Sequence, residues 1–135
     1  MSTSLEDRVT QLVKDLGGPN SEDVMCVLRN MPGEAIEFLA SAFDHEPDNE
    51  RRALVVRAIW QFRDERAVPT LVGALRDHHA PVWKEALDGL VTIGGPHALG
   101  ALENGRVIVE GWSDARARLG WIQEALEQVR ERDAG

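Results

Sequence analysis

The sequence predicts an all-α protein: a right-handed α-solenoid of about three helical hairpins, with a capping helix at each end. Two segments that start 31 residues apart have nearly the same pattern, FRDERAVPTL at residues 62–71 and IGGPHALGAL at residues 93–102. Apolar residues recur at helical spacing along the chain, and no segment shows the sustained alternation of a β-strand. A repeat of this period is typical of a solenoid, in which each unit covers an apolar face of its neighbour.

The first predicted element is a capping helix over residues 4–16. Ser4 suits the N-cap position because its hydroxyl can accept a hydrogen bond from the first helical turn. The Gly-Gly-Pro run at residues 17–19 is expected to end the helix. Its single apolar face consists of Leu5, Val9, Leu12, Val13 and Leu16.

Three hairpins are predicted next, over residues 21–44, 49–76 and 81–103. The second and third match at the 31-residue offset, with small residues opposite small ones and large apolar residues opposite large ones. The first is a weaker copy, which matches after a one-residue deletion in its loop. The opening helix of the second hairpin has two apolar stripes, so we expect other helices to cover it on both sides.

A second capping helix is predicted over residues 113–132, starting at Ser113 and keeping a polar outer face. Its apolar face consists of Ala115, Leu119, Ile122, Leu126 and Val129. The segment RVIVEGW at residues 106–112 is the only β-prone stretch of the sequence. We interpret this segment as an extended linker between the last hairpin and the cap.

Residues 51–77 and 82–102 resemble HEAT repeats, specifically the short type similar to those of phycobilin-lyase-like proteins. The motif of an early Arg, spaced apolar residues, an Ala-Val pair and a closing Leu is met by Arg52, Val55, Ile59, Phe62, Ala67, Val68 and Leu71. In the next copy Trp83 replaces the Arg, which is expected to cost a polar contact between repeats. The resemblance covers about residues 21–103 and implies a solenoid. Family members mostly look like binding scaffolds, while some handle bilin chromophores and some act on DNA.

The charge of the chain is unevenly distributed. The net charge is −8, and residues 1–50 alone hold 11 acidic and 3 basic residues, whereas residues 51–135 hold 12 of each. Such a field repels phosphate backbones and attracts basic surfaces, so we expect a basic protein partner and no nucleic acid. The alternative is a solvated face that only keeps the protein in solution.

The partner-binding residues are predicted in the first hairpin. Three carboxylates share one helix face with Ser41, Phe38 projects beside them, and three more carboxylates follow in the adjoining turn. A half-exposed Trp on the last helix is a further candidate. The predicted partner-binding set is Glu34, Glu37, Phe38, Asp44, Glu46, Asp48, Glu50 and Trp121. An aromatic residue beside a carboxylate row is typical of a hot spot for a basic partner, although Phe38 also fits a position packed under the first helix.

The sequence contains no established catalytic, cofactor-binding or metal-binding motif. The turns Asp44-His45-Glu46 and Asp77-His78-His79 recur at similar repeat positions, which leaves a divalent-metal site as an alternative, but their spacing matches no zinc motif. Cys26 has no nearby histidine and is interpreted as a buried residue. We therefore expect no catalytic residues, no cofactor and no metal.

The predicted function is a non-catalytic protein-interaction module that binds a basic protein, with an inhibitor such as a bacterial immunity protein of a toxin as a narrower possibility. The alternative is a small enzyme, or a protein that handles a chromophore or another ligand, which the family resemblance alone favours. The start of the chain is polar and no apolar run approaches the roughly 20 residues that span a bilayer, so we expect a cytoplasmic protein with no membrane contact. The oligomeric state is left open.

Overall fold

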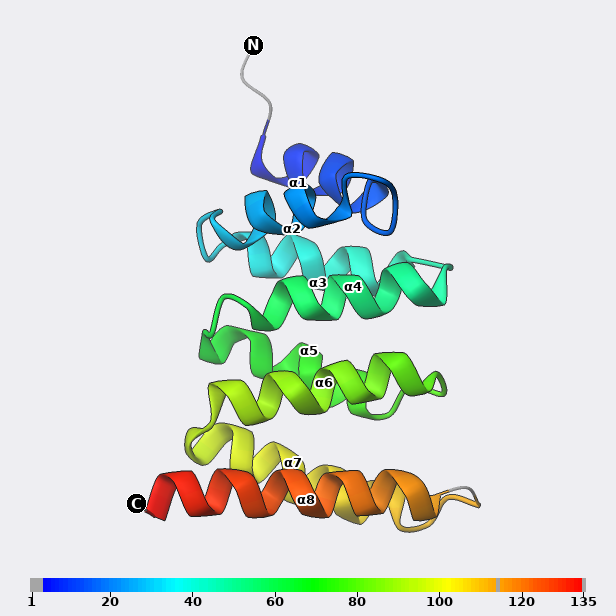
Figure 1. Ribbon diagram of the computed structural model, residues 1–135, viewed down its shortest axis with the longest axis vertical. Helices are drawn as coiled ribbons and strands as arrows, with labels where there is room; N and C mark the ends of the chain where they lie inside the picture. Colours follow the sequence, from blue (N-terminus) through cyan, green and yellow to red (C-terminus); the bar gives the residue numbers. More distant parts are fainter. Residues whose placement is uncertain (1–3, 114, 135) are drawn as a thin grey trace.

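The structure is a computed structural model that describes residues 4–113 and 115–134. Within these residues the chain forms α-helices and one short 3-10 helix, with no β-strand, stacked along one axis (Figure 1). The elements are α1 Leu5–Lys14, α2 Ser21–Arg29, α3 Ala35–His45, α4 Asn49–Trp60, η1 Glu65–Ala67, α5 Val68–Leu75, α6 Ala80–Ile93, α7 Gly95–Val109 and α8 Ala115–Ala134. The predicted all-α solenoid is confirmed.

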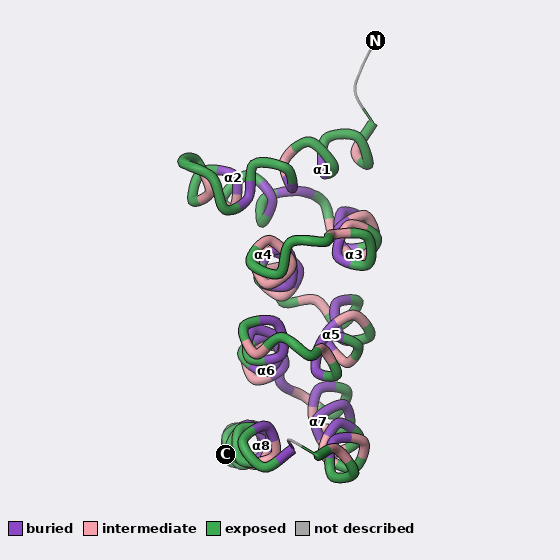
Figure 2. Tube along the Cα trace, turned by 90° about the vertical axis from the view of Figure 1, so that its right-hand side faces the viewer, coloured by how far each residue is buried: buried purple, intermediate pink, exposed green. Residues whose placement is uncertain are grey.

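The helices form two layers, which Figure 2 shows end-on. Helices α2, α4, α6 and α8 make one layer, and α1, α3, α5 and α7 make the other. Along the first layer α4 contacts α6 and α6 contacts α8, while α5 contacts α7 in the second layer. Contacts of α3 with α4, of α5 with α6 and of α7 with α8 join the layers. Each inner helix is therefore covered on more than one side, as the two apolar stripes of α4 predict.

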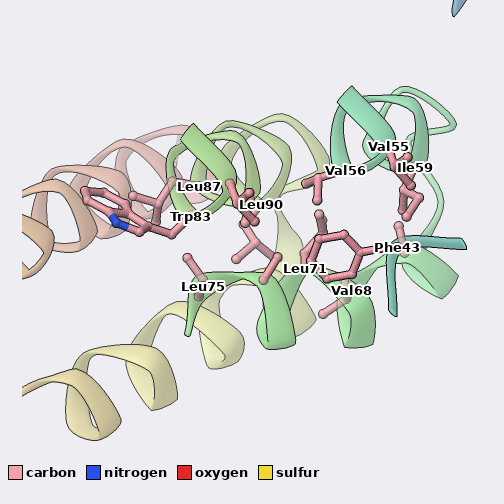
Figure 3. Packing of buried hydrophobic residues seen from close by; sticks show 14 of the residues in the cluster. Phe43, Val55, Val56, Ile59, Val68, Leu71, Leu75, Trp83, Leu87 and Leu90 are labelled. Atoms are coloured by element: carbon pink, nitrogen blue, oxygen red, sulfur yellow. The ribbon is translucent and has the colours of Figure 1, made fainter. Parts of the chain in front are cut away.

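The core lies between the two layers and continues along the stack (Figure 3). Val55 and Ile59 of α4, Leu71 and Leu75 of α5, and Leu90 of α6 are all fully buried. Burying one such side chain stabilises a fold by about 1.5–3 kcal/mol relative to leaving it in water. Each layer contains every second helix of the chain. Within one helix the apolar residues recur on one face, and that face points toward the core.

A serine caps the start of α1, and two glycines form the turn between α6 and α7. The Ser4 hydroxyl accepts a hydrogen bond from the backbone N–H of Asp7 at 3.1 Å, as predicted for the N-cap of α1. Between α6 and α7 the chain turns at Gly94 and Gly95, whose φ angles are 64° and 80°. L-residues with a side chain rarely adopt such angles, so the two glycines allow the direct α6–α7 turn.

The prediction of an extended linker at residues 106–112 is wrong, because α7 continues past residue 103 to Val109. Val109 is fully buried, and Gly105 is also buried, where an added Cβ atom would lie 3.0 Å from Cδ1 of Leu75 on α5. The β-branched residues of this stretch weakly disfavour a helix, but burial outweighs that preference. The third hairpin is therefore longer than predicted, and α8 packs against both α6 and α7.

Helices α4 and α6 approach each other closely at Gly89. A Cβ atom added there would lie 2.6 Å from Cβ of Trp60, 2.7 Å from its Cγ and 2.8 Å from its Cδ1. Trp60 is half-buried against the core rather than fully enclosed. The absence of a side chain at Gly89 thus lets the Trp60 ring lie directly on the α6 backbone.

Trp83, which stands where the repeat pattern has an Arg, is buried. A guanidinium group still reaches this place, because Arg118 of α8 lies 4.9 Å from the centre of the Trp83 ring. Arg118 also donates a hydrogen bond from Nη1 to the carbonyl oxygen of Leu75 at 3.0 Å. A residue from the last helix therefore makes the polar contact across the repeat boundary that the sequence pattern predicted to be lost.

The ion pair between Arg52 and Asp77 connects α4 to the turn after α5. Burial raises the pKa of the Asp77 carboxyl, but the hydrogen bonds from Arg52 and from the backbone N–H of His79 outweigh it. The pKa therefore lies below its ordinary value of 3.8. A depressed folded-state pKa contributes stability that is fully present above the ordinary value and is lost as the pH falls through the lower folded value.

Replacing Asp77 with Asn is therefore expected to lower the free energy of unfolding by roughly 1–2 kcal/mol at pH 7, because the charged hydrogen bond from Arg52 is lost. The difference from the wild type should stay constant down to about pH 5 and shrink below about pH 4. Urea unfolding of both proteins at a series of pH values measures this difference in the free energy of unfolding. Glu103→Gln is the matched control, because its ion pair with Arg130 is exposed and should contribute little at any pH. A difference for Asp77→Asn that does not change with pH would contradict the role of its charge.

Candidate functional site

An exposed acidic stripe runs along α3. Glu34, Glu37, Ser41 and Asp44 are all exposed, at successive spacings of three, four and three residues. The rotation of α3 about its own axis is fixed by the face opposite the stripe. That face consists of Ala35, Ile36, Leu39 and Phe43, which are buried. The stripe therefore faces solvent because the apolar residues of the same helix face the core.

The turn between α3 and α4 extends this acidic surface, with one exception. Asp48 and Glu50 are exposed, whereas Glu46 is half-buried and forms an ion pair with Arg51 at 2.9 Å. Arg51 also donates from Nε to the carbonyl oxygen of Leu16, which ties the turn to the end of α1. Glu46 thus has a structural partner, and five of the six predicted carboxylates are exposed to solvent.

A basic side chain borders the stripe at the start of α3. Glu34 and Glu37 line a shallow hollow of about 270 Å³ together with Arg66. Arg66 lies against the backbone of Gly33 and is paired with Asp64 at 2.8 Å. The guanidinium of Arg66 is held by Asp64, so it offsets the negative charge of the stripe only in part.

Phe38 is half-buried and packs against the core, at the interface of α3 with the rest of the stack. Of the two positions that the sequence leaves open for this residue, the structure therefore favours the packed one. Phe38 is nevertheless not fully buried, so it stays a candidate at the edge of the acidic surface rather than a projecting anchor.

Trp121 lies away from the acidic surface. Its side chain is 46% exposed, in line with the half-exposure that its place beside the apolar stripe of the last helix predicts. However, α8 lies at the opposite end of the stack from α1–α3, and it belongs to the other layer than α3 (Figures 1 and 2). The predicted binding residues therefore divide into an acidic surface around α3 and a separate aromatic position on α8.

A polar network that the sequence did not predict joins α4 to α6. Glu85 is buried and accepts two hydrogen bonds from Arg57, at 3.0 Å from Nε and 3.1 Å from Nη2. The indole N–H of Trp60 donates to the same carboxylate at 2.9 Å. The hydrogen bond to Glu85 is the main reason that the pKa of Arg57 is raised. Asp88, one turn after Glu85, has a raised pKa because of burial first and the nearby Glu85 second.

The two histidine-containing turns are engaged in local contacts. His45 forms a hydrogen bond between Nδ1 and the carbonyl oxygen of Ser41 at 2.9 Å, and Asp77 is occupied by Arg52. In the described part of the chain, no three His, Cys, Asp or Glu side chains are grouped so that they could hold a metal ion. The turns therefore do not converge on a shared set of ligands.

Cys26 is exposed, so its interpretation as a buried residue is wrong. It lies on α2 near the end of the stack, where Val24 and Leu28 face inward and are buried. Cys26 follows Val24 by two residues and so points away from that face. Burial of this cysteine would require a further helix outside α2.

The comparisons with known proteins agree with the architecture. A sequence model of HEAT repeats matches residues 36–118, which is more than half of the chain. No curated protein sequence matches the chain at a significant level. None of the helices in the described residues is both long enough and apolar enough to cross a bilayer.

Proposed function

Because this chain belongs to the HEAT-repeat family, we propose that it is a non-catalytic module that binds a basic protein surface through the acidic surface around α3. HEAT repeats commonly serve as scaffolds for protein interactions. The backbone of α3 places the exposed carboxylates in one row, so the partner meets them on a single helix face and only their side chains have to be ordered on binding.

The observation that carries this proposal is the exposed row formed by Glu34, Glu37 and Asp44, continued by Asp48 and Glu50. No Lys or Arg occurs in the sequence between Arg29 and Arg51, so α3 itself supplies no positive charge to balance them. A concentrated negative field increases the rate of encounter with a basic protein and disfavours acidic ones.

A narrower form of the proposal is that the module inhibits its partner, as an immunity protein neutralises a toxin in a bacterial cytoplasm. The small acidic scaffold supports this form, because a basic active-site surface can be covered by a rigid acidic one. If the module is an inhibitor, the purified chain is expected to abolish the activity of the partner at equimolar concentration. A partner that stays fully active when saturated with this chain would reduce the proposal to an adaptor role.

A basic protein partner is first isolated by affinity capture on this chain. Reversing two charges of the stripe, in the double variant Glu34→Lys/Glu37→Lys, is expected to reduce the association rate with that partner by roughly 10- to 100-fold. Rim charges act mainly on association, so the dissociation rate should change less. Surface plasmon resonance at several salt concentrations measures both rates. The wild type should also show the steeper loss of association rate with salt.

The matched control is Glu127→Lys/Glu131→Lys, which reverses two exposed charges on α8 far from α3. The net charge of the two variants is identical, so a response to total charge alone would be equal in both. An equal loss of association rate, or a loss only in the α8 variant, would show that the acidic surface around α3 is not the binding surface.

A further inference from the structure

Residues of helices α4, α6 and α8 line an open cleft of about 320 Å³. We call it the tryptophan cleft and define it by Trp60, Asp88, Trp121 and Glu124, which line it from the three helices. Its size is at the lower end of the range for ligand sites, so it has room for one side chain rather than a large cofactor.

We propose that the tryptophan cleft receives a lysine or arginine side chain of a protein partner, held between the aromatic rings of Trp60 and Trp121 and the carboxylates of Asp88 and Glu124. This inference rests on the proposed function only in taking the partner to be a protein with a basic surface. It assigns a second contact point, on the opposite layer of the stack from the acidic surface around α3.

The two aromatic walls are held in place by the protein. The indole N–H of Trp60 donates to Glu85 at 2.9 Å, and its ring rests on the backbone at Gly89. Trp121 meets the buried Trp83 edge to face, with 6.3 Å between the ring centres. Neither ring has to be ordered when a ligand enters, which lowers the entropic cost of binding.

The rings are suited to a cation because the face of an indole attracts positive charge. Trp121 already shows this property, since Nζ of Lys84 lies 4.8 Å from the centre of its ring. Lys84 does not line the tryptophan cleft, and the Trp121 side chain is still 46% exposed. Accessible aromatic surface therefore remains for a second positive group from a partner.

The charges around the cleft favour a cationic occupant over a neutral or anionic one. Asp88 and Glu124 contribute negative charge, and no Lys or Arg is among the residues that line the cleft. The guanidinium of Arg57 is held by both oxygens of Glu85. Asp88 and Glu124 are exposed, so both carboxylates are accessible to a positive group from a partner.

The experiment uses the intact protein and two short peptides, acetyl-Gly-Arg-Gly-amide and its citrulline counterpart, which has nearly the same shape without the charge. The indole N–H signals of the tryptophans are followed by NMR and assigned with single Trp→Phe variants. The arginine peptide is expected to shift the Trp60 and Trp121 signals saturably, with a dissociation constant on the order of 1–10 mM for so small a ligand. The citrulline peptide should bind at least tenfold more weakly.

Two variants test the residues of the cleft. Trp121→Ala and Glu124→Gln are each expected to weaken binding of the arginine peptide by about threefold to tenfold, from the loss of a cation–π contact or a charge partner. Glu127→Gln, the next exposed carboxylate on α8, is the matched control and should leave binding unchanged. Thermal unfolding of each variant verifies that the fold is intact, and the remaining Trp60 signal reports on binding in Trp121→Ala.

Equal binding of the citrulline peptide would overturn the proposal, as would full binding by both Trp121→Ala and Glu124→Gln. Binding of the arginine peptide is measured without any partner, so it does not depend on the α3 charge reversal. If the arginine peptide does not bind but Glu34→Lys/Glu37→Lys associates more slowly with the partner, only the proposal for the tryptophan cleft is overturned. If the arginine peptide binds but the double variant associates as fast as the wild type, the proposal for the cleft stands and the proposal for the acidic surface around α3 is overturned.

Discussion

Replacing Leu71 with Ala is expected to lower the free energy of unfolding by about 2–5 kcal/mol. Leu71 is fully buried on α5, in the middle of the stack, where side chains of both layers surround it (Figure 3). Its truncation removes apolar contacts and leaves a cavity that neighbouring helices cannot fill without shifting. The loss is comparable with much of the total stability of a small domain, and urea unfolding measures it.

The control for Leu71→Ala is Val107→Ala on α7, where the side chain is 62% exposed. This change should alter the free energy of unfolding by no more than about 0.5 kcal/mol. Comparable losses for the two variants would contradict the packing of α5 between the layers. The pair therefore tests whether the apolar residues of the repeat form the shared core.

Replacing Gly89 with Ala is expected to destabilise the fold by about 1–3 kcal/mol, although alanine is normally the better helix former. The new methyl group would lie within 3 Å of three Trp60 atoms, among them Cβ, which is tied to the α4 backbone. Helices α4 and α6 must then move apart, or Trp60 must leave Glu85 and the ring position that it holds. Thermal unfolding gives the loss of stability, and the NMR signal of the Trp60 indole N–H reports on the ring.

Gly100→Ala is the matched control, because Gly100 lies inside α7, is exposed, and has no atom near its added Cβ. That variant should be stabilised by up to about 1 kcal/mol through helix propensity alone. The two substitutions are chemically the same, so opposite signs isolate the contact with Trp60. A stabilisation of Gly89→Ala would show that α4 and α6 are not in close contact at this point.

The two proposed surfaces place different demands on a partner. The acidic surface around α3 is open and exposed, so its charges act at a distance and mainly on association. The tryptophan cleft has two aromatic walls that an inserted side chain would contact directly, so such a side chain would act mainly on dissociation. A basic partner that used both would have to reach around the edge of the stack, since the two surfaces belong to opposite layers.

The sequence by itself determined the helical repeat and the outward faces of its helices. The 31-residue offset predicts stacked hairpins because a helix with apolar residues at regular spacing has to bury that face against another unit. The same spacing predicts that Glu34, Glu37 and Asp44 are exposed together on α3, and it predicts the half-exposure of Trp121. These are properties of one helix, so a local pattern is enough to specify them.

Only the tertiary structure decided which neighbour covers each face. Cys26 is exposed on α2, away from the buried Val24 and Leu28, and α7 continues to a Val109 that the stack buries completely. Glu85 reaches Arg57 and Trp60 across 28 and 25 residues of chain, since α4 and α6 lie side by side in one layer. The tryptophan cleft likewise needs three helices, two from successive repeats and one from the C-terminal cap. Helical periodicity specifies the direction of a side chain, whereas the residues that it meets depend on how the repeats stack.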